Sequence, residues 1–88
     1  MVERKIIIQN RYGLHARPAA QFVGIASKYD ANVTISKDGV EVNGKSIMSV
    51  LILAAEKGNE IILRAEGKDE AELIQALAEL LEGKFNEE

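Results

Sequence analysis

The residues best suited to chemistry lie together in Gly13–Ala19, which reads Gly-Leu-His-Ala-Arg-Pro-Ala. This stretch holds the only histidine and the only proline of the 88 residues, with Arg17 between them. The residues before it predict the end of a strand, and those after it predict an amphipathic helix. The first N–H groups of a helix lack intrahelical acceptors and carry partial positive charge, so such a junction can bind an anion. An imidazole beside an anion site is the arrangement that a phosphorylated histidine requires.

Each residue of this stretch also has an ordinary explanation. A lone histidine near a helix start is usually a solvated or capping residue, and a lone arginine is usually a surface charge. However, Arg17 offers a planar fork that suits phosphate oxygens. Pro18 falls in the first helical turn, where its missing N–H costs nothing. Since Ala16 leaves the space beside His15 open, the combination favours a phosphate-handling site.

Composition excludes several classes of function. We expect one domain, residues 1–88, because a chain of this length has room for one hydrophobic core. A net charge of −3 and only two Phe and two Tyr residues argue against binding of nucleic acid or a membrane surface. With no cysteine and one histidine we expect no metal and no cofactor. The lack of cysteines, of a signal peptide and of a long apolar run is typical of a cytoplasmic protein.

Hydrophobic periodicity predicts the elements of the first half. The β-branched segment Val2–Ile8 predicts a strand, followed by a helix over Ala19–Ala26 that ends near residues 28–30. Alternation over residues 32–36 predicts a second strand. Asp38-Gly39 is a favoured type I′ hairpin turn that leads into a short return strand at Val40–Val42.

We expect Ser46 to cap a short helix over Ile47–Ala55. Its apolar residues fall on two arcs, and the arc of Val50, Leu53 and Ala54 can face the core. Either the whole segment is buried, or the second arc is an exposed patch of the kind that marks a partner surface. This second arc, hereafter the apolar arc, consists of Ile47, Met48, Leu51 and Ile52.

The last third predicts a strand over Ile61–Ala65 and a helix capped by Asp69. The helix has an apolar stripe from Leu73 to Leu81, and its glutamates, Glu70 among them, form the solvated face. The tail, residues 86–88, is expected to fray. The element order is β-α-β-β-α-β-α, which predicts an α+β, open-faced β-sandwich. In this fold, three helices pack on one face of a four-stranded antiparallel sheet.

Two motifs at this separation resemble the HPr family, the histidine-containing phosphocarriers of the bacterial phosphoenolpyruvate-dependent sugar phosphotransferase system. Gly13–Ala19 is similar to the family's active-site motif, and Lys45-Ser46-Ile47-Met48 to its regulatory serine motif. The resemblance covers essentially the whole chain in length and element order. Departures are Ser49 and Ala54, where relatives often carry glycine, and Gly24, where they often carry a polar or basic residue.

The resemblance implies a role for each motif. His15 would accept a phosphoryl group on Nδ1 from Enzyme I and pass it to the IIA domains of sugar permeases, with Arg17 contacting the group. Ser46 would be phosphorylated by HPr kinase/phosphorylase, and a catabolite-repression regulator would then be a further partner. The apolar arc would form the docking patch, together with Ala16 and Ala20. A monomeric carrier that is not itself an enzyme is implied.

Three other functions stay open. A nitrogen-branch phosphocarrier is the nearest, although the serine motif favours the sugar branch. A small regulatory binding module would need a ligand pocket between subunits. An acylphosphatase-like enzyme would need an arginine–asparagine pair around a water, but Asn32 and Asn43 lie far along the chain from Arg17.

Overall fold

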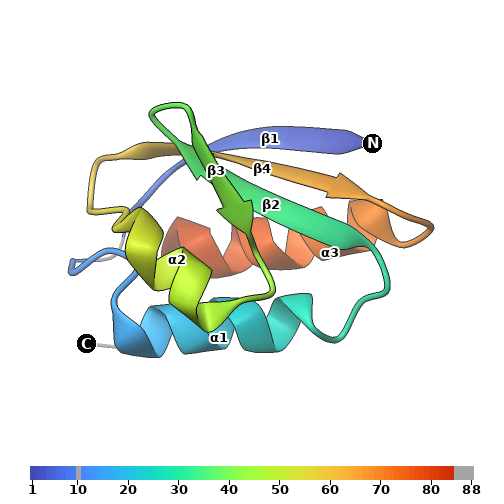
Figure 1. The fold of residues 1–88 in the computed structure, drawn as a ribbon, viewed down its shortest axis with the longest axis horizontal. Helices are drawn as coiled ribbons and strands as arrows, with labels where there is room; N and C mark the ends of the chain where they lie inside the picture. Colours follow the sequence, from blue (N-terminus) through green and yellow to red (C-terminus); the bar gives the residue numbers. More distant parts are fainter. Residues whose placement is uncertain (10, 85–88) are drawn as a thin grey trace.

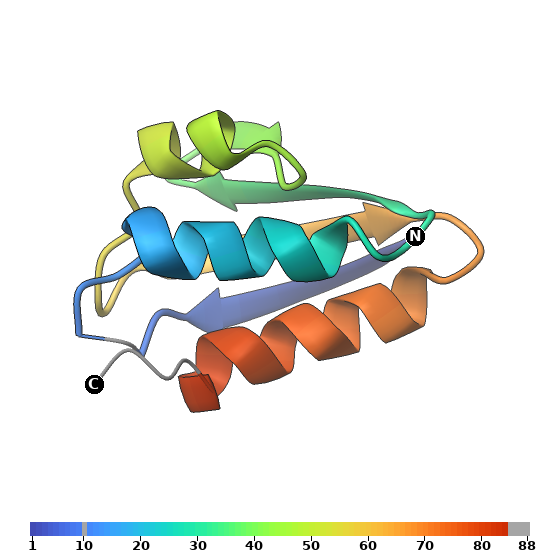
Figure 2. The same cartoon turned by 90° about the horizontal axis from the view of Figure 1, so that it is seen from below.

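A four-stranded antiparallel sheet in the order β1-β4-β2-β3 forms one layer of the molecule, in a computed structural model that describes residues 1–9 and 11–84. The elements follow the predicted order: β1 (Val2–Ile7), α1 (Ala16–Ala26), β2 (Asn32–Lys37), β3 (Val40–Asn43), α2 (Ile47–Leu53), β4 (Glu60–Glu66) and α3 (Glu70–Glu79), extended by the π-helical turn η1 (Leu80–Lys84). All three helices lie on one side of the sheet (Figure 1), with α1 between α2 and α3 (Figure 2). The predicted fold is therefore confirmed. The expected tail, residues 86–88, lies outside the described residues.

The core lies between the sheet and the helices. Register pairs alternate between the two faces, so Ile6 opposite Ile61 and Ile35 opposite Leu63 are buried. Phe22 of α1 and Leu77 of α3 meet them from the helical layer and are fully buried. One buried cluster therefore unites strands from both ends of the chain. No helix among the described residues is long and apolar enough to cross a membrane.

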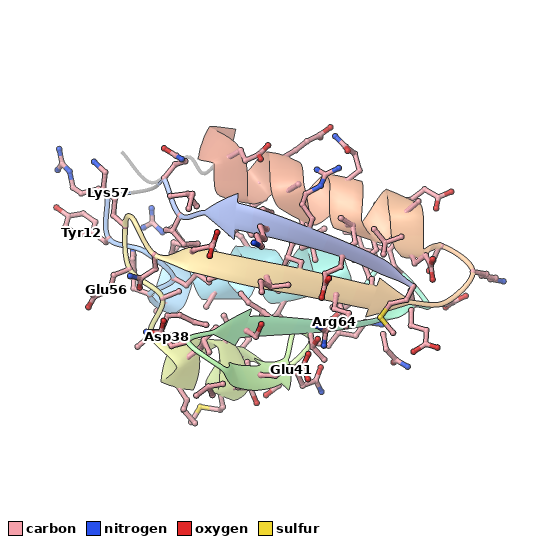
Figure 3. All side chains as sticks on the ribbon, turned by 90° about the horizontal axis from the view of Figure 1, so that it is seen from above. Tyr12, Asp38, Glu41, Glu56, Lys57 and Arg64 are labelled. Carbon is pink, nitrogen blue, oxygen red and sulfur yellow. The ribbon has the colours of Figure 1, made fainter. Side chains whose placement is uncertain are left out.

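On the open face of the sheet, polar side chains meet across neighbouring strands, among them the Arg64 and Glu41 labelled in Figure 3. Arg64 of β4 bonds Glu3 of β1 through Nε at 3.0 Å, and its Nη1 lies 2.9 Å from Glu41 Oε2 of β3. The Thr34 hydroxyl of β2 donates to the same Glu41 oxygen at 2.8 Å. Glu3 and Glu41 both raise the pKa of Arg64. These exposed contacts cross all four strands and help to fix their register.

Two expectations about α3 are corrected. Asp69 occupies the N-cap position, but its carboxylate makes no capping bond; it instead accepts the N–H groups of Asp30 at 2.9 Å and Ala31 at 2.8 Å. These donors turn Asp69 toward the loop before β2. Glu70 is half-buried rather than solvated, because it accepts the Gly67 N–H at 3.0 Å and pairs with the terminal amine of Met1 at 3.0 Å.

The Asp69 contact predicts a pH dependence of stability. The N–H of Asp30, with that of Ala31, lowers the pKa of Asp69 below its ordinary value. A carboxyl group with a lowered folded-state pKa stabilises the fold fully above its unfolded pKa, about 3.9. That contribution is lost as the pH falls through the folded value. We therefore expect Asp69→Ala to lower the urea midpoint at pH 7, and we expect the difference in midpoint between variant and wild type to become smaller below pH 4. An equal difference in midpoint at both pH values would contradict this role.

Candidate functional site

His15 is the N-cap of α1, because this helix begins at Ala16, three residues before the predicted start at Ala19. Its backbone is extended, with φ −83° and ψ −167°, and its carbonyl accepts the Ala19 N–H at 2.8 Å. The imidazole is exposed and does not cap the helix. The N–H groups of Ala16 and Arg17 precede the first i→i−4 bond and so have no intrahelical acceptor. The helix start therefore presents amide donors next to an accessible imidazole.

The two residues before His15 are locked to the segment that follows α2. Gly13 has φ +68°, and a Cβ there would lie 2.3 Å from the Ala55 carbonyl oxygen, so this site accepts only glycine. Leu14 is buried, and its N–H donates to the same oxygen at 2.8 Å. The backbone that carries His15 is thus held by a non-local contact.

A hollow of about 230 Å³ opens beside His15. Its walls come from the loop before α1, the last turn of α2 and the segment before β4. The lining residues are Tyr12, Leu14, His15, Leu51, Ala54, Ala55 and Glu56. Neither Asn32 nor Asn43 lines it. A larger hollow of about 310 Å³ lies between α1 and α3, lined by Ile25 and Tyr29 among others, and contains none of the predicted site residues.

Tyr12 is a neighbour of His15 that sequence reasoning did not single out. Its ring centroid lies 5.8 Å from that of the imidazole, with the planes at 79°, an edge-on contact. Arg11 lies over the Tyr12 ring at 5.5 Å and bonds its hydroxyl at 3.3 Å. The only signal in the sequence was an aromatic residue three positions before the histidine. Nothing local indicates that the ring turns back toward His15.

Arg17, the second residue of α1, is exposed. In the part of the chain that the structure describes, its guanidinium makes no hydrogen bond or ion pair. Ala16 and Ala20 are exposed on the same helix. The structure thus leaves the donors of Arg17 available in the first turn of α1, two residues after His15.

The predicted cap of α2 is present. Ser46 Oγ accepts the Ser49 N–H at 3.2 Å, and the Ser46 side chain is half-buried. Figure 2 shows the end of α2 beside the start of α1, whereas the start of α2 lies beside the middle of α1. Ser46 and His15 therefore lie near opposite ends of α2.

The apolar arc is exposed, which excludes burial of the whole segment. Ile47 is 43% exposed, Met48 67% and Ile52 73%, whereas Leu51 is half-buried and lines the hollow beside His15. Val50 and Leu53 face the core as expected. Ala54 does not, because α2 ends at Leu53 and Ala54 is an exposed C-cap in the left-handed conformation. The exposed arc thus continues toward His15 through Leu51.

Across the described ranges, no group of three or more Asp, Glu or His side chains is placed to hold a metal ion. What the site offers is an imidazole, the amides of one helix start and one guanidinium. Such a set can accept an anionic group on nitrogen and stabilise it.

Comparisons with known proteins show the family to which the chain is similar. The family model for the phosphorylation site of the HPr component of the phosphotransferase system matches residues 2–83. The phosphocarrier protein HPr of Xylella fastidiosa (strain 9a5c) is 49% identical over 88 residues, covering 100% of this chain and 99% of its own.

Solved structures share the fold. An HPr structure from Thermoanaerobacter tengcongensis is 51% identical, with a TM-score of 0.95 over 100% of this chain and 99% of that chain. The Bacillus subtilis catabolite repression protein Crh, solved as an intertwined dimer with a swapped domain, is 43% identical, with a TM-score of 0.76. That match covers 93% of this chain and 94% of that chain.

Proposed function

This chain belongs to the HPr family, the phosphocarriers of the phosphotransferase system, and we propose that His15 is the residue on which it carries the phosphoryl group. One observation supports this assignment above all: His15 occupies the N-cap position of α1 and its exposed imidazole borders an open hollow. In the first step a P–N bond forms at Nδ1 of His15 as the bond between the phosphorus atom and Enzyme I breaks. In the second, this P–N bond breaks as a IIA domain of a sugar permease accepts the group.

The surroundings of His15 suit transient storage of a phosphoryl group. Phosphoryl transfer demands mainly positioning and stabilisation of charge. The amides of Ala16 and Arg17 and the guanidinium of Arg17 are the donors for the new phosphoryl oxygens. A carrier must also release the group, and a few exposed donors stabilise the group less strongly than a closed pocket would. Enzyme I and the IIA domain would supply the rest of each reaction centre, which makes the chain a carrier, not an enzyme.

The test is a reconstituted relay. Phosphoenolpyruvate, Enzyme I and a glucose-type IIA domain are incubated with and without this chain, and phosphorylation of the IIA domain is followed on Phos-tag gels. We expect phosphorylation of the IIA domain only when the chain is present. Phosphorylation at an equal rate in the absence of the chain, or no phosphorylation in its presence, would contradict the proposal. This function places the protein in the cytoplasm, and a monomer suffices for it.

The apolar arc is the surface that we expect to dock against Enzyme I and the IIA domain. Met48→Asp should raise the apparent KM for Enzyme I by about tenfold or more, since a carboxylate would be desolvated in an apolar contact. The fold should persist because the side chain is 67% exposed. Transfer kinetics and a thermal melt check both statements. The exposed Val40, on a strand of the sheet, offers the control Val40→Asp, which should leave the KM unchanged. Unfolding of Met48→Asp would instead show that Met48 packs in the core.

We further propose Ser46 as a site of regulatory phosphorylation by HPr kinase/phosphorylase, with a catabolite-repression regulator as the reader. Ser46 adjoins the apolar arc, so a phosphate there would be desolvated against Enzyme I. Ser46→Asp should therefore raise the apparent KM for Enzyme I several-fold and leave the circular dichroism spectrum unchanged. Ser46→Asn, which keeps a capping oxygen without the charge, is the control. Equal kinetics for wild type and Ser46→Asp would remove Ser46 from this role.

A further inference from the structure

We propose that Lys37, at the end of β2, is a positioning residue for His15: its ammonium holds a strained turn that carries the backbone behind the imidazole. This proposal rests on the proposed function of His15 for its kinetic consequence. Its structural part concerns only contacts among β2, the end of α2 and the loop before α1.

The strained residue is Ala54, the C-cap of α2. Its backbone is left-handed, with φ 56° and ψ 43°, a conformation in which the Cβ of an L-residue crowds the following carbonyl oxygen. Its N–H bonds the Leu51 carbonyl at 3.1 Å, which ends the helix. A non-glycine residue keeps this conformation only when its surroundings hold it there.

Lys37 supplies such a restraint. Its Nζ donates to the Ala54 carbonyl oxygen at 3.1 Å, and the side chain is half-buried. The backbone of Lys37 is itself fixed, because it pairs with Val40 across the tight Asp38-Gly39 turn. Figure 3 shows Asp38 and Glu56, which follow Lys37 and Ala55, at the same end of the sheet as Tyr12. The ammonium thus ties the strained peptide to the rigid sheet.

Ala54 is connected to His15 through Ala55 and the hydrogen bond that Ala55 accepts from Leu14. Ala55 follows Ala54, and its carbonyl oxygen accepts the Leu14 N–H at 2.8 Å. The same oxygen lies against Gly13, where not even a methyl group would fit. A rotation of the Ala54–Ala55 peptide would therefore move the acceptor that holds the residue before His15. Ala54 and His15 also line the same hollow, so the position of one wall depends on this bond.

The structural test is hydrogen exchange of the Leu14 amide, measured by NMR. We expect Lys37→Met, which keeps the aliphatic stem, to speed exchange at Leu14 by about tenfold while the core amides of β4 stay unchanged. Lys37→Arg should restore slow exchange because it retains a donor. Ala54→Gly in the Lys37→Met background should also restore it, because glycine adopts φ 56° without strain. Lys57→Met removes a charge from the same end of the sheet and is the matched control.

The kinetic test is transfer from Enzyme I to the same variants. Lys37→Met should slow transfer by about three- to tenfold, with rescue by Lys37→Arg and by the added Ala54→Gly. Unchanged Leu14 exchange in Lys37→Met would overturn the proposal, as would faster exchange throughout the core or equal slowing in Lys57→Met. If wild type accepted no phosphoryl group, the proposed function would fail, while the exchange measurements would still decide whether Lys37 positions the loop.

Discussion

His15→Ala will accept no phosphoryl group from Enzyme I, whereas wild type becomes fully phosphorylated under the same conditions. His15 is the only imidazole in the 88 residues, so no second nitrogen of this kind can replace it. The hydroxyl groups near the site do not form the acid-labile, base-stable bond that a phosphohistidine forms. The measurement is intact-protein mass spectrometry after incubation with phosphoenolpyruvate and Enzyme I.

The fold of His15→Ala is expected to persist. The imidazole is exposed and makes no capping bond, and the backbone bond from Ala19 to residue 15 does not depend on the side chain. A thermal melt close to that of wild type is the control. A phosphorylated and folded His15→Ala would show that the phosphoryl group is carried elsewhere.

Arg17→Ala will slow transfer from Enzyme I by roughly 30- to 150-fold. Loss of a charge-assisted, bidentate contact to phosphoryl oxygens typically costs about 2–3 kcal/mol. Because Arg17 is exposed and has no partner among the described residues, nothing in the fold depends on its guanidinium. Rapid-quench kinetics of the single transfer step is the appropriate measurement.

Two variants separate charge from geometry at this position. Arg17→Lys keeps the charge but lacks the planar fork, so it should recover only part of the rate. Lys28→Ala removes a cation just beyond the other end of α1 and should transfer like wild type. A loss of thermal stability in Arg17→Ala with unchanged transfer would make Arg17 a structural residue.

Local pattern was sufficient for most of the fold. Alternation placed Ile35 and Leu63 on the buried face, and Asp38-Gly39 adopts the two positive φ angles, 53° and 84°, that a type I′ turn requires. Helix capping is equally local, which is why Ser46 was placed correctly. His15 at the first turn of α1 follows from the same kind of reasoning.

The features missed by sequence reasoning depend on contacts between distant segments. Asp69 was expected to cap its own helix, but its carboxylate instead accepts hydrogen bonds from the N–H groups of residues 30 and 31. Ala54 was placed on a buried arc, yet the helix ends one residue earlier and leaves it left-handed. The edge-on approach of Tyr12 to His15 likewise depends on how the loop folds. No periodicity contains that information.

For the apolar arc, the sequence pattern is compatible with either burial or exposure. Its four residues are hydrophobic in either case, and only the placement of α2 at the margin of the helical layer decides which arc meets the core (Figure 2). Exposure of the arc matters for function because Leu51, one of its residues, lines the hollow beside His15.

The most direct test of the account is the stoichiometry and position of the phosphoryl group. Radiolabelled phosphoenolpyruvate, a catalytic amount of Enzyme I and an excess of this chain are incubated without any IIA domain, and both protein-bound label and free phosphate are measured. We predict one acid-labile, base-stable phosphoryl group per chain, mapped to His15, with negligible release of phosphate during the labelling. Continuous release of phosphate without protein-bound label, or label on any other residue, would contradict a carrier that works through His15.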